Sequence, residues 1–166
     1  MRNGRYDSGF TFVEVLIATL LVGLAIASLL AANRAFTQAN DAGTDLSTAE
    51  FLLEQIKELT ALLPVVEPGT PESAVDVFGP ESGETLATYD DLNDFDGASY
   101  SPPINADRNL LNEYATFSQQ VTVENVSASD FEQVVGDHGS SFVRVTVSVY
   151  QNAQQITAAS WLRARY

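Results

Sequence analysis

The chain has 166 residues, 45% of them hydrophobic, and a net charge of −14 with an isoelectric point near 4.1. This length suits one small domain beside a membrane segment. Such an acidic surface repels the phosphates of nucleic acid, so we expect no nucleic-acid partner. The sequence has no cysteine, which excludes disulfides, thiolate nucleophiles and cysteine-based metal sites.

An apolar run near the N-terminus, residues 10–32, contains a single charge, that of Glu14. As a helix, this run would be roughly 35 Å long, enough to cross a bilayer core of about 30 Å. A carboxylate within such a segment costs about 2.5–3.5 kcal/mol at mid-membrane and less near the edge. We therefore expect Glu14 to pair with a cation that also lies in the membrane. The simpler alternative is that its side chain reaches the headgroup layer and has no further role.

A short leader, residues 1–9, precedes the run and carries Arg2 and Arg5 against Asp7. Its positive charge favours a cytoplasmic N-terminus, with the rest of the chain exported. Two ordinary interpretations fit in part. A secretory signal would have a shorter apolar core and a cleavage site, for which Ala31-Ala32 is the candidate. A plain single-pass anchor explains the length of the run but not Glu14.

The residues at this junction are Gly9-Phe10-Thr11-Phe12-Val13-Glu14-Val15-Leu16-Ile17-Ala18. This segment resembles the N-terminus of type IV prepilins and of the pseudopilins of type II secretion. The resemblance implies that prepilin peptidase, a membrane aspartyl peptidase, cleaves between Gly9 and Phe10 and methylates Phe10. It also implies that Glu14 pairs with the amine of a neighbouring subunit during filament assembly.

The same resemblance implies the elongated lollipop shape of pilins and a single-pass inner-membrane precursor with a periplasmic head. Its partners would be other pilin or pseudopilin subunits, prepilin peptidase, the inner-membrane assembly platform and, before assembly, membrane lipid. The later segment Ala49-Glu50-Phe51-Leu52-Leu53-Glu54-Gln55-Ile56 is similar to minor pilins. We expect a minor pilin or pseudopilin; the alternatives are a major pilin or, outside the family, a membrane-anchored acidic binding or sensor module.

Helical periodicity continues beyond the apolar run, because apolar residues recur at steps of mostly three and four. These residues are Phe36, Ala39, Leu46, Ala49, Leu53, Ile56, Leu59 and Leu63. Pro64 is expected to end the helix. The pattern predicts one helix over residues 10–63, with a membrane or filament-core half at 10–32 and an amphipathic half at 33–63.

Residues 64–113 hold all six prolines and form an acidic loop region, with short strands expected near residues 74–78 and 84–88. Within it, Asp90, Asp91, Asp94 and Asp96, closed by Gly97, offer oxygen ligands suited to Ca²⁺. The spacing does not match an EF-hand. The alternative is a solvated loop or a subunit contact.

Beyond residue 113 the hydrophobic period changes to two, which predicts an antiparallel sheet over residues 114–166. The inward face of the first strand is expected to hold Phe117, Gln119, Val121 and Val123. That of the second is expected to hold Val143, Val145, Val147 and Val149. A third strand is expected at residues 154–163, with Ile156 and Trp161 as its anchors in the core. Residues 151–153 are expected to form a turn, and residues 130–135 a short helix or turn. Because the sheet has one apolar face, we expect the helix stripe over residues 46–63 to cover it, giving an α+β fold.

Catalytic chemistry has little support. His138 lies between Asp137 and Ser140, but nothing in the sequence orients these three side chains as a triad. One histidine without cysteine also argues against a catalytic zinc site. We therefore expect no enzymatic activity and no cofactor apart from the candidate Ca²⁺.

Overall fold

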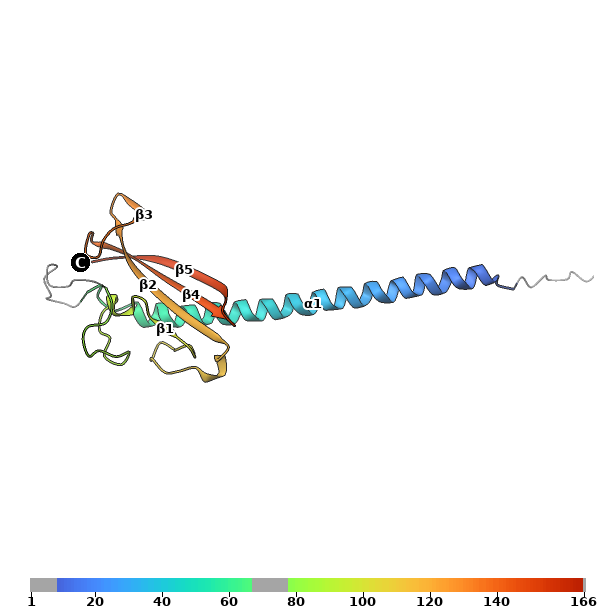
Figure 1. The fold of residues 1–166 in the computed structure, drawn as a ribbon, viewed down its shortest axis with the longest axis horizontal. Helices are drawn as coiled ribbons and strands as arrows, with labels where there is room; N and C mark the ends of the chain where they lie inside the picture. The colour runs from blue at the N-terminus through green and yellow to red at the C-terminus, as the bar shows by residue number, and fades with distance from the viewer. Residues whose placement is uncertain (1–8, 67–77, 166) are drawn as a thin grey trace, which may run out of the picture. The chain divides into compact units, whose positions relative to one another are not determined.

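The computed structural model describes residues 9–66 and 78–165, which contain one long helix and an antiparallel sheet of five strands (Figure 1). Helix α1 runs over Phe12–Thr60. The chain divides into two compact units, one up to Thr44 and one from Asp45 onward. Helix α1 therefore contributes to both units, and each is described by itself.

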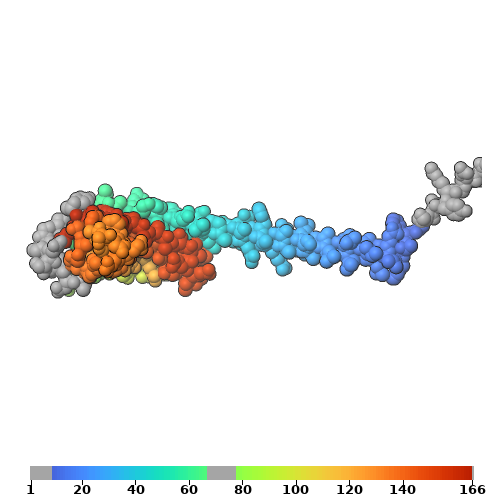
Figure 2. Space-filling model, turned by 90° about the horizontal axis from the view of Figure 1, so that it is seen from above, coloured from blue at the N-terminus to red at the C-terminus, as the bar shows by residue number. Residues whose placement is uncertain are grey.

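In the first unit, every described residue from 9 to 44 is exposed within this chain, the apolar ones included. Figure 2 shows this part of α1, in blue to cyan, as a helix with nothing packed on its visible face. By length and composition α1 is long and apolar enough to cross a membrane. A helix that is apolar all round is stable only where lipid or other protein covers it.

The second unit is built on a sheet with the strand order β1-β2-β4-β5, and β3 pairs with the far end of β2. All the neighbouring strands are antiparallel. The strands are β1 (Ser99–Tyr100), β2 (Phe117–Ser127), β3 (Asp130–Val134), β4 (Phe142–Gln151) and β5 (Gln154–Ala164). Two short 3₁₀ helices, η2 (Asn93–Phe95) and η3 (Asn112–Tyr114), lie in the loops before β1 and before β2.

The core lies between the second half of α1 and one face of this sheet, as the sequence predicts. Helix α1 buries Ala49, Leu52, Leu53 and Ile56. The alternating residues predicted for the inner faces of β2 and β4 are all buried, and Ile156 and Trp161 of β5 are partly buried against them. The period-two pattern thus identified the buried face of β2 and that of β4.

Gln119 is the polar centre of this core and is fully buried. Its Nε2 donates to Leu52 O of α1 at 2.8 Å and to Ile104 O at 3.1 Å, while its Oε1 accepts from Ile104 N at 2.8 Å. A buried amide is stable only when its hydrogen bonds are made. One side chain of β2 therefore connects the helix, the sheet and the loop that follows β1.

The predicted helix differs from the observed one at its C-terminal end and in the extent of its buried stripe. Helix α1 ends at Thr60, and the backbone tightens into a turn in which Leu63 N donates to Thr60 O at 3.3 Å. Proline disfavours the α conformation in the residue that precedes it, so Pro64 helps to end the helix before its own position. Phe36 and Leu46 are exposed, so the buried stripe of the helix begins only at Ala49.

Two further predictions of local structure are wrong. Residues 84–88 form turns instead of a strand: Thr88 N donates to Thr85 O at 2.8 Å, and Thr85 N to Thr88 Oγ1 at 2.9 Å. Hydrogen bonds of this local kind compete with strand pairing. Of the other expected short strand, residues 74–77 lie outside the described residues.

Residues 130–134 form strand β3 rather than a helix or turn. The chain reverses after β2, and β3 pairs back onto it with Val126 opposite Val134. The ring of Phe131 packs against that of Phe142, with centroids 5.3 Å apart. Pairing and ring packing therefore override the weak local preference of a five-residue segment.

Candidate functional site

The predicted processing site lies immediately before α1. Gly9 and Phe10 precede the first helical residue, and Phe10 is 83% exposed. Thr11 is the N-cap of the helix: Glu14 N donates to Thr11 Oγ1 at 3.2 Å, and Thr11 N to Glu14 Oε2 at 3.5 Å. This reciprocal pair is a capping box, with the acid at the third helical position.

The capping box gives Glu14 a local role that the sequence analysis overlooked, although Thr-x-x-Glu before an apolar run is its usual signal. The capping hydrogen bonds give partners to backbone N–H groups of the first turn that have none within the helix. A carboxylate at this position also lies near the positive end of the helix dipole. A glutamine could accept the same hydrogen bond without the charge. Capping and charge pairing by Glu14 can therefore be separated by substitution.

The second candidate site is the acidic loop that leads from α1 to β1. Asp91 and Asp94 are fully buried and cap each other's backbone. Asp94 Oδ2 accepts from Asp90 N at 3.0 Å and from Asp91 N at 3.2 Å, while Asp91 Oδ1 accepts from Asn93 N at 2.9 Å. These bonds close the turn that begins η2, so the two carboxylates are held in place by the backbone they cap.

The structure brings three of the four predicted aspartates together, since Asp90, Asp91 and Asp94 have carboxylate oxygens within 4.8 Å of one another. Asp96 lies apart from this group and accepts a hydrogen bond from Val123 N of β2 at 2.8 Å. A second trio, Glu81, Glu84 and Asp94, meets the same distance limit. Asp94 is therefore common to two groups of acids.

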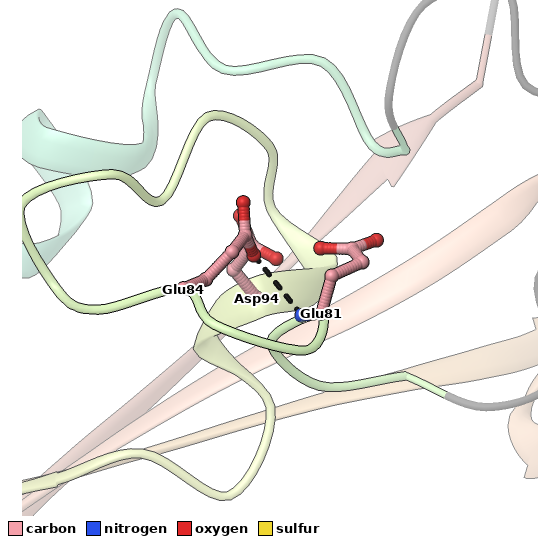
Figure 3. Close-up of side chains that lie close together, drawn as sticks. All are labelled: Glu81, Glu84 and Asp94. Carbon is pink, nitrogen blue, oxygen red and sulfur yellow. Dashed lines mark hydrogen bonds between the residues drawn. The ribbon is translucent and has the colours of Figure 1, made fainter.

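Figure 3 shows the side chains of Glu81, Glu84 and Asp94 pointing toward one another. Glu81 N donates to Glu84 Oε2 at 3.0 Å, and Gly79 N donates to Asn93 O at 3.1 Å. The first bond closes the 81–84 turn and the second joins it to η2. The sequence analysis missed both glutamates, because only this fold of the loop places them beside Asp94, which lies thirteen positions after Glu81 and ten after Glu84.

The crowding of these acids changes their protonation. Burial is the main reason why the pKa of Asp91 and that of Asp94 each rise to about 6. The pKa of Glu81 rises to about 7, chiefly because a protonated Glu81 hydrogen-bonds Glu84, and the same bond lowers the pKa of Glu84. The cluster therefore tends to retain protons, and at neutral pH its remaining negative charges are close together.

The residues weighed as a catalytic triad have structural roles instead. Asp137 Oδ2 accepts from Phe78 N at 3.0 Å, His138 N donates to Asn125 Oδ1, and Ser140 Oγ donates to Val126 O. The His138 ring packs edge-on against Phe78, with centroids 5.1 Å apart. These contacts fasten the loop between β3 and β4, and they do not orient a nucleophile toward a base.

No family model, no curated protein and no solved structure matches this chain.

Proposed function

We propose that this chain is a type IV pilin-like structural subunit, a minor pilin or a pseudopilin, which prepilin peptidase processes before it joins a pilus or a secretion pseudopilus. The observation that carries the proposal is the segment from Gly9 to Glu14 at the start of a helix whose apolar residues up to residue 44 are all exposed within the chain. Such a helix needs a membrane first and other helices later. A filament core supplies the second environment.

The chemistry of Glu14 supports the proposal. Cleavage after Gly9 would create a cationic amine on Phe10, four residues before the carboxylate. An unpaired charge in an apolar environment is costly, whereas a paired one is tolerated. No ion pair among the described residues involves Glu14. Its carboxylate can therefore attract the amine of a neighbouring subunit and set the register of the added subunit.

The proposal includes the position and shape of the protein. The precursor would cross the inner membrane once, with its N-terminus in the cytoplasm and an acidic head outside, in the lollipop arrangement of pilins. Its partners would be other pilin or pseudopilin subunits, prepilin peptidase and the assembly platform. The sheet packed on the second half of α1 suits such a head.

The intact mass of the membrane-extracted protein tests the proposal. We expect loss of residues 1–9 and the gain of one methyl group on Phe10, both abolished in a strain without prepilin peptidase. A full-length N-terminus in a strain with active peptidase would instead indicate a single-pass anchor with an acidic sensor or binding domain. A fragment that begins near residue 33 would indicate a secretory signal.

Three variants test how Glu14 acts. Glu14→Ala removes both the cap and the charge, Glu14→Gln keeps an acceptor for Thr11 N but removes the charge, and Thr11→Ala removes the hydroxyl cap alone. Losing one member of a buried pair costs about 3–5 kcal/mol. We therefore expect both Glu14 variants to be cleaved normally yet absent from sheared filaments, and Thr11→Ala to be incorporated. Normal incorporation of Glu14→Gln would show that capping, and not pairing, is its role.

A further inference from the structure

We propose that the loop between α1 and β1 binds one Ca²⁺ ion, with Asp94 as the central ligand and Glu81 and Glu84 completing the site from the solvent side. This site differs from the one expected at residues 90–96, because Asp96 bonds to β2 and two upstream glutamates take its place. The proposal does not depend on the function proposed above.

The first argument is an oxygen atom without a donor. Asp94 is fully buried, and no hydrogen-bond donor among the described residues reaches its Oδ1. Its other oxygen already accepts two backbone N–H groups, so the side chain cannot turn to satisfy Oδ1 without losing these bonds. Buried polar atoms in folded proteins almost always have a partner. Because Asp94 also belongs to a trio of carboxylates, a bound cation would supply the missing partner.

The second argument is the geometry of the trio. The ligand oxygens of Glu81, Glu84 and Asp94 lie within 4.8 Å of one another (Figure 3). Ca²⁺ binds oxygens at about 2.3–2.6 Å, so oxygens on opposite sides of one ion lie about 5 Å apart. Mg²⁺ needs shorter bonds and a stricter octahedron. A partly exposed set of three carboxylates at this spacing therefore favours Ca²⁺.

The charges around the loop support the same ion. None of the ion pairs among residues 9–66 and 78–165 involves an acid of the cluster. Arg108 contacts this loop near the cluster, but its guanidinium donates to Leu86 O at 2.9 Å and to Tyr89 O at 2.6 Å.

Asp91 is a positioning residue in this site. Both of its oxygens accept hydrogen bonds, Oδ1 from Asn93 N and Asp94 N, and Oδ2 from Asn93 Nδ2. These bonds hold the backbone of Asp94 in place. The ion would then join the 81–84 turn to η2, whose Phe95 is buried in the core. Binding should therefore stabilise the whole second unit.

The experiment uses the full chain, purified in detergent and freed of metal with EDTA. Calcium chloride and magnesium chloride are titrated calorimetrically, and thermal unfolding is followed by the fluorescence of Trp161, the single tryptophan, which packs against the core. Asp94→Asn retains an acceptor for Asp90 N and Asp91 N but removes the charge. The double variant Glu81→Gln/Glu84→Gln removes the other two charges and leaves the buried Asp94 unchanged. Asp107→Asn, an exposed carboxylate in another turn, is the matched control.

We expect one Ca²⁺ to bind and to raise the unfolding temperature of the unmodified chain and of Asp107→Asn. Both effects should be lost in Asp94→Asn and in the glutamine double variant. A stabilisation by Ca²⁺ that persists in these variants, or that Mg²⁺ reproduces at equal concentration, would mean general screening of the acidic surface and would overturn the proposal. Absence of binding heat and of stabilisation at millimolar Ca²⁺ would also overturn it, leaving a cluster held by shared protons.

Discussion

Asp94 and Gln119 show two ways in which a buried polar side chain can be placed in this protein. Gln119 has donors and acceptors for both of its amide atoms, from α1 and from the loop that follows β1. Asp94 has partners for one oxygen only. The first arrangement specifies how the helix meets the sheet. The second leaves a charge that depends on pH and on ions in solution.

The carboxylates around Asp94 predict an unusual dependence of stability on pH. Folding raises the pKa of Asp91 and that of Asp94 to about 6, and that of Glu81 to about 7, above the ordinary range near 4. The native state therefore binds more protons than the unfolded state between about pH 4 and 7, and its stability falls as the pH rises through this interval.

In EDTA, we accordingly expect the unfolding temperature read from Trp161 to be higher at pH 5 than at pH 8. Asp94→Asn should flatten this dependence, because the variant lacks one of the titrating groups. Asp107→Asn should retain it. A stability that rises from pH 5 to pH 8 would show that ionising these acids does not destabilise the native loop.

At the scale of elements, the C-terminal end of α1 depends on a residue of the last strand. Arg163 of β5 donates from Nη1 to Thr60 O at 3.0 Å and to Ala61 O at 3.1 Å, and from Nη2 to Leu63 O at 2.9 Å. The last carbonyls of a helix have no partner within it. The planar fork of an arginine can satisfy several at once, and its charge complements the helix dipole.

We expect Arg163→Lys to destabilise the second unit by about 1–3 kcal/mol, because a lysine keeps the charge but cannot span the three carbonyls. Thermal or urea unfolding followed by Trp161 fluorescence measures the change. Arg163→Ala should cost more, since it also removes the charge. Equal stabilities of Arg163→Lys and the unmodified chain would show that charge alone holds the helix end.

The elements that the sequence predicted well are those whose signal is local. Alternation along Val143, Val145, Val147 and Val149 identifies a strand and its buried face without knowledge of its neighbours. The turn at Asn152 and Ala153 was also expected, and both residues have positive φ angles, 49° and 66°. Repeated apolar spacing likewise predicted the helix and the face it buries from Ala49 onward.

Apart from residues 84–88, where local hydrogen bonds form turns, the features that the sequence did not predict depend on distant partners. Strand β3 exists because β2 pairs with it and Phe142 packs on Phe131. The helix end is satisfied by a residue about a hundred positions away. Glu81 joins Asp94 only through the fold of the loop. No local sequence pattern predicts these three features. The capping box of Thr11 and Glu14, in contrast, has a local sequence signal and could have been predicted.

For the molecule as a whole, the net charge of −14 bears on how many copies can assemble. Like charges on neighbouring heads repel each other unless a cation or a basic partner lies between them. This repulsion favours a subunit used sparingly within the proposed filament. Quantitative mass spectrometry of sheared filaments should then find far fewer copies of this chain than of the most abundant pilin, and equal or greater abundance would indicate a major pilin.

The contact between Arg163 and the end of α1 has a consequence for biosynthesis. The ribosome makes the helix first, yet the carbonyls at its end wait for a side chain that is synthesised about a hundred residues later. Until then, β4 also lacks its partner β5. A nascent chain stalled before this point would display an open strand edge and a frayed helix, which chaperones and proteases recognise. The second unit can therefore close only after β5 has left the ribosome.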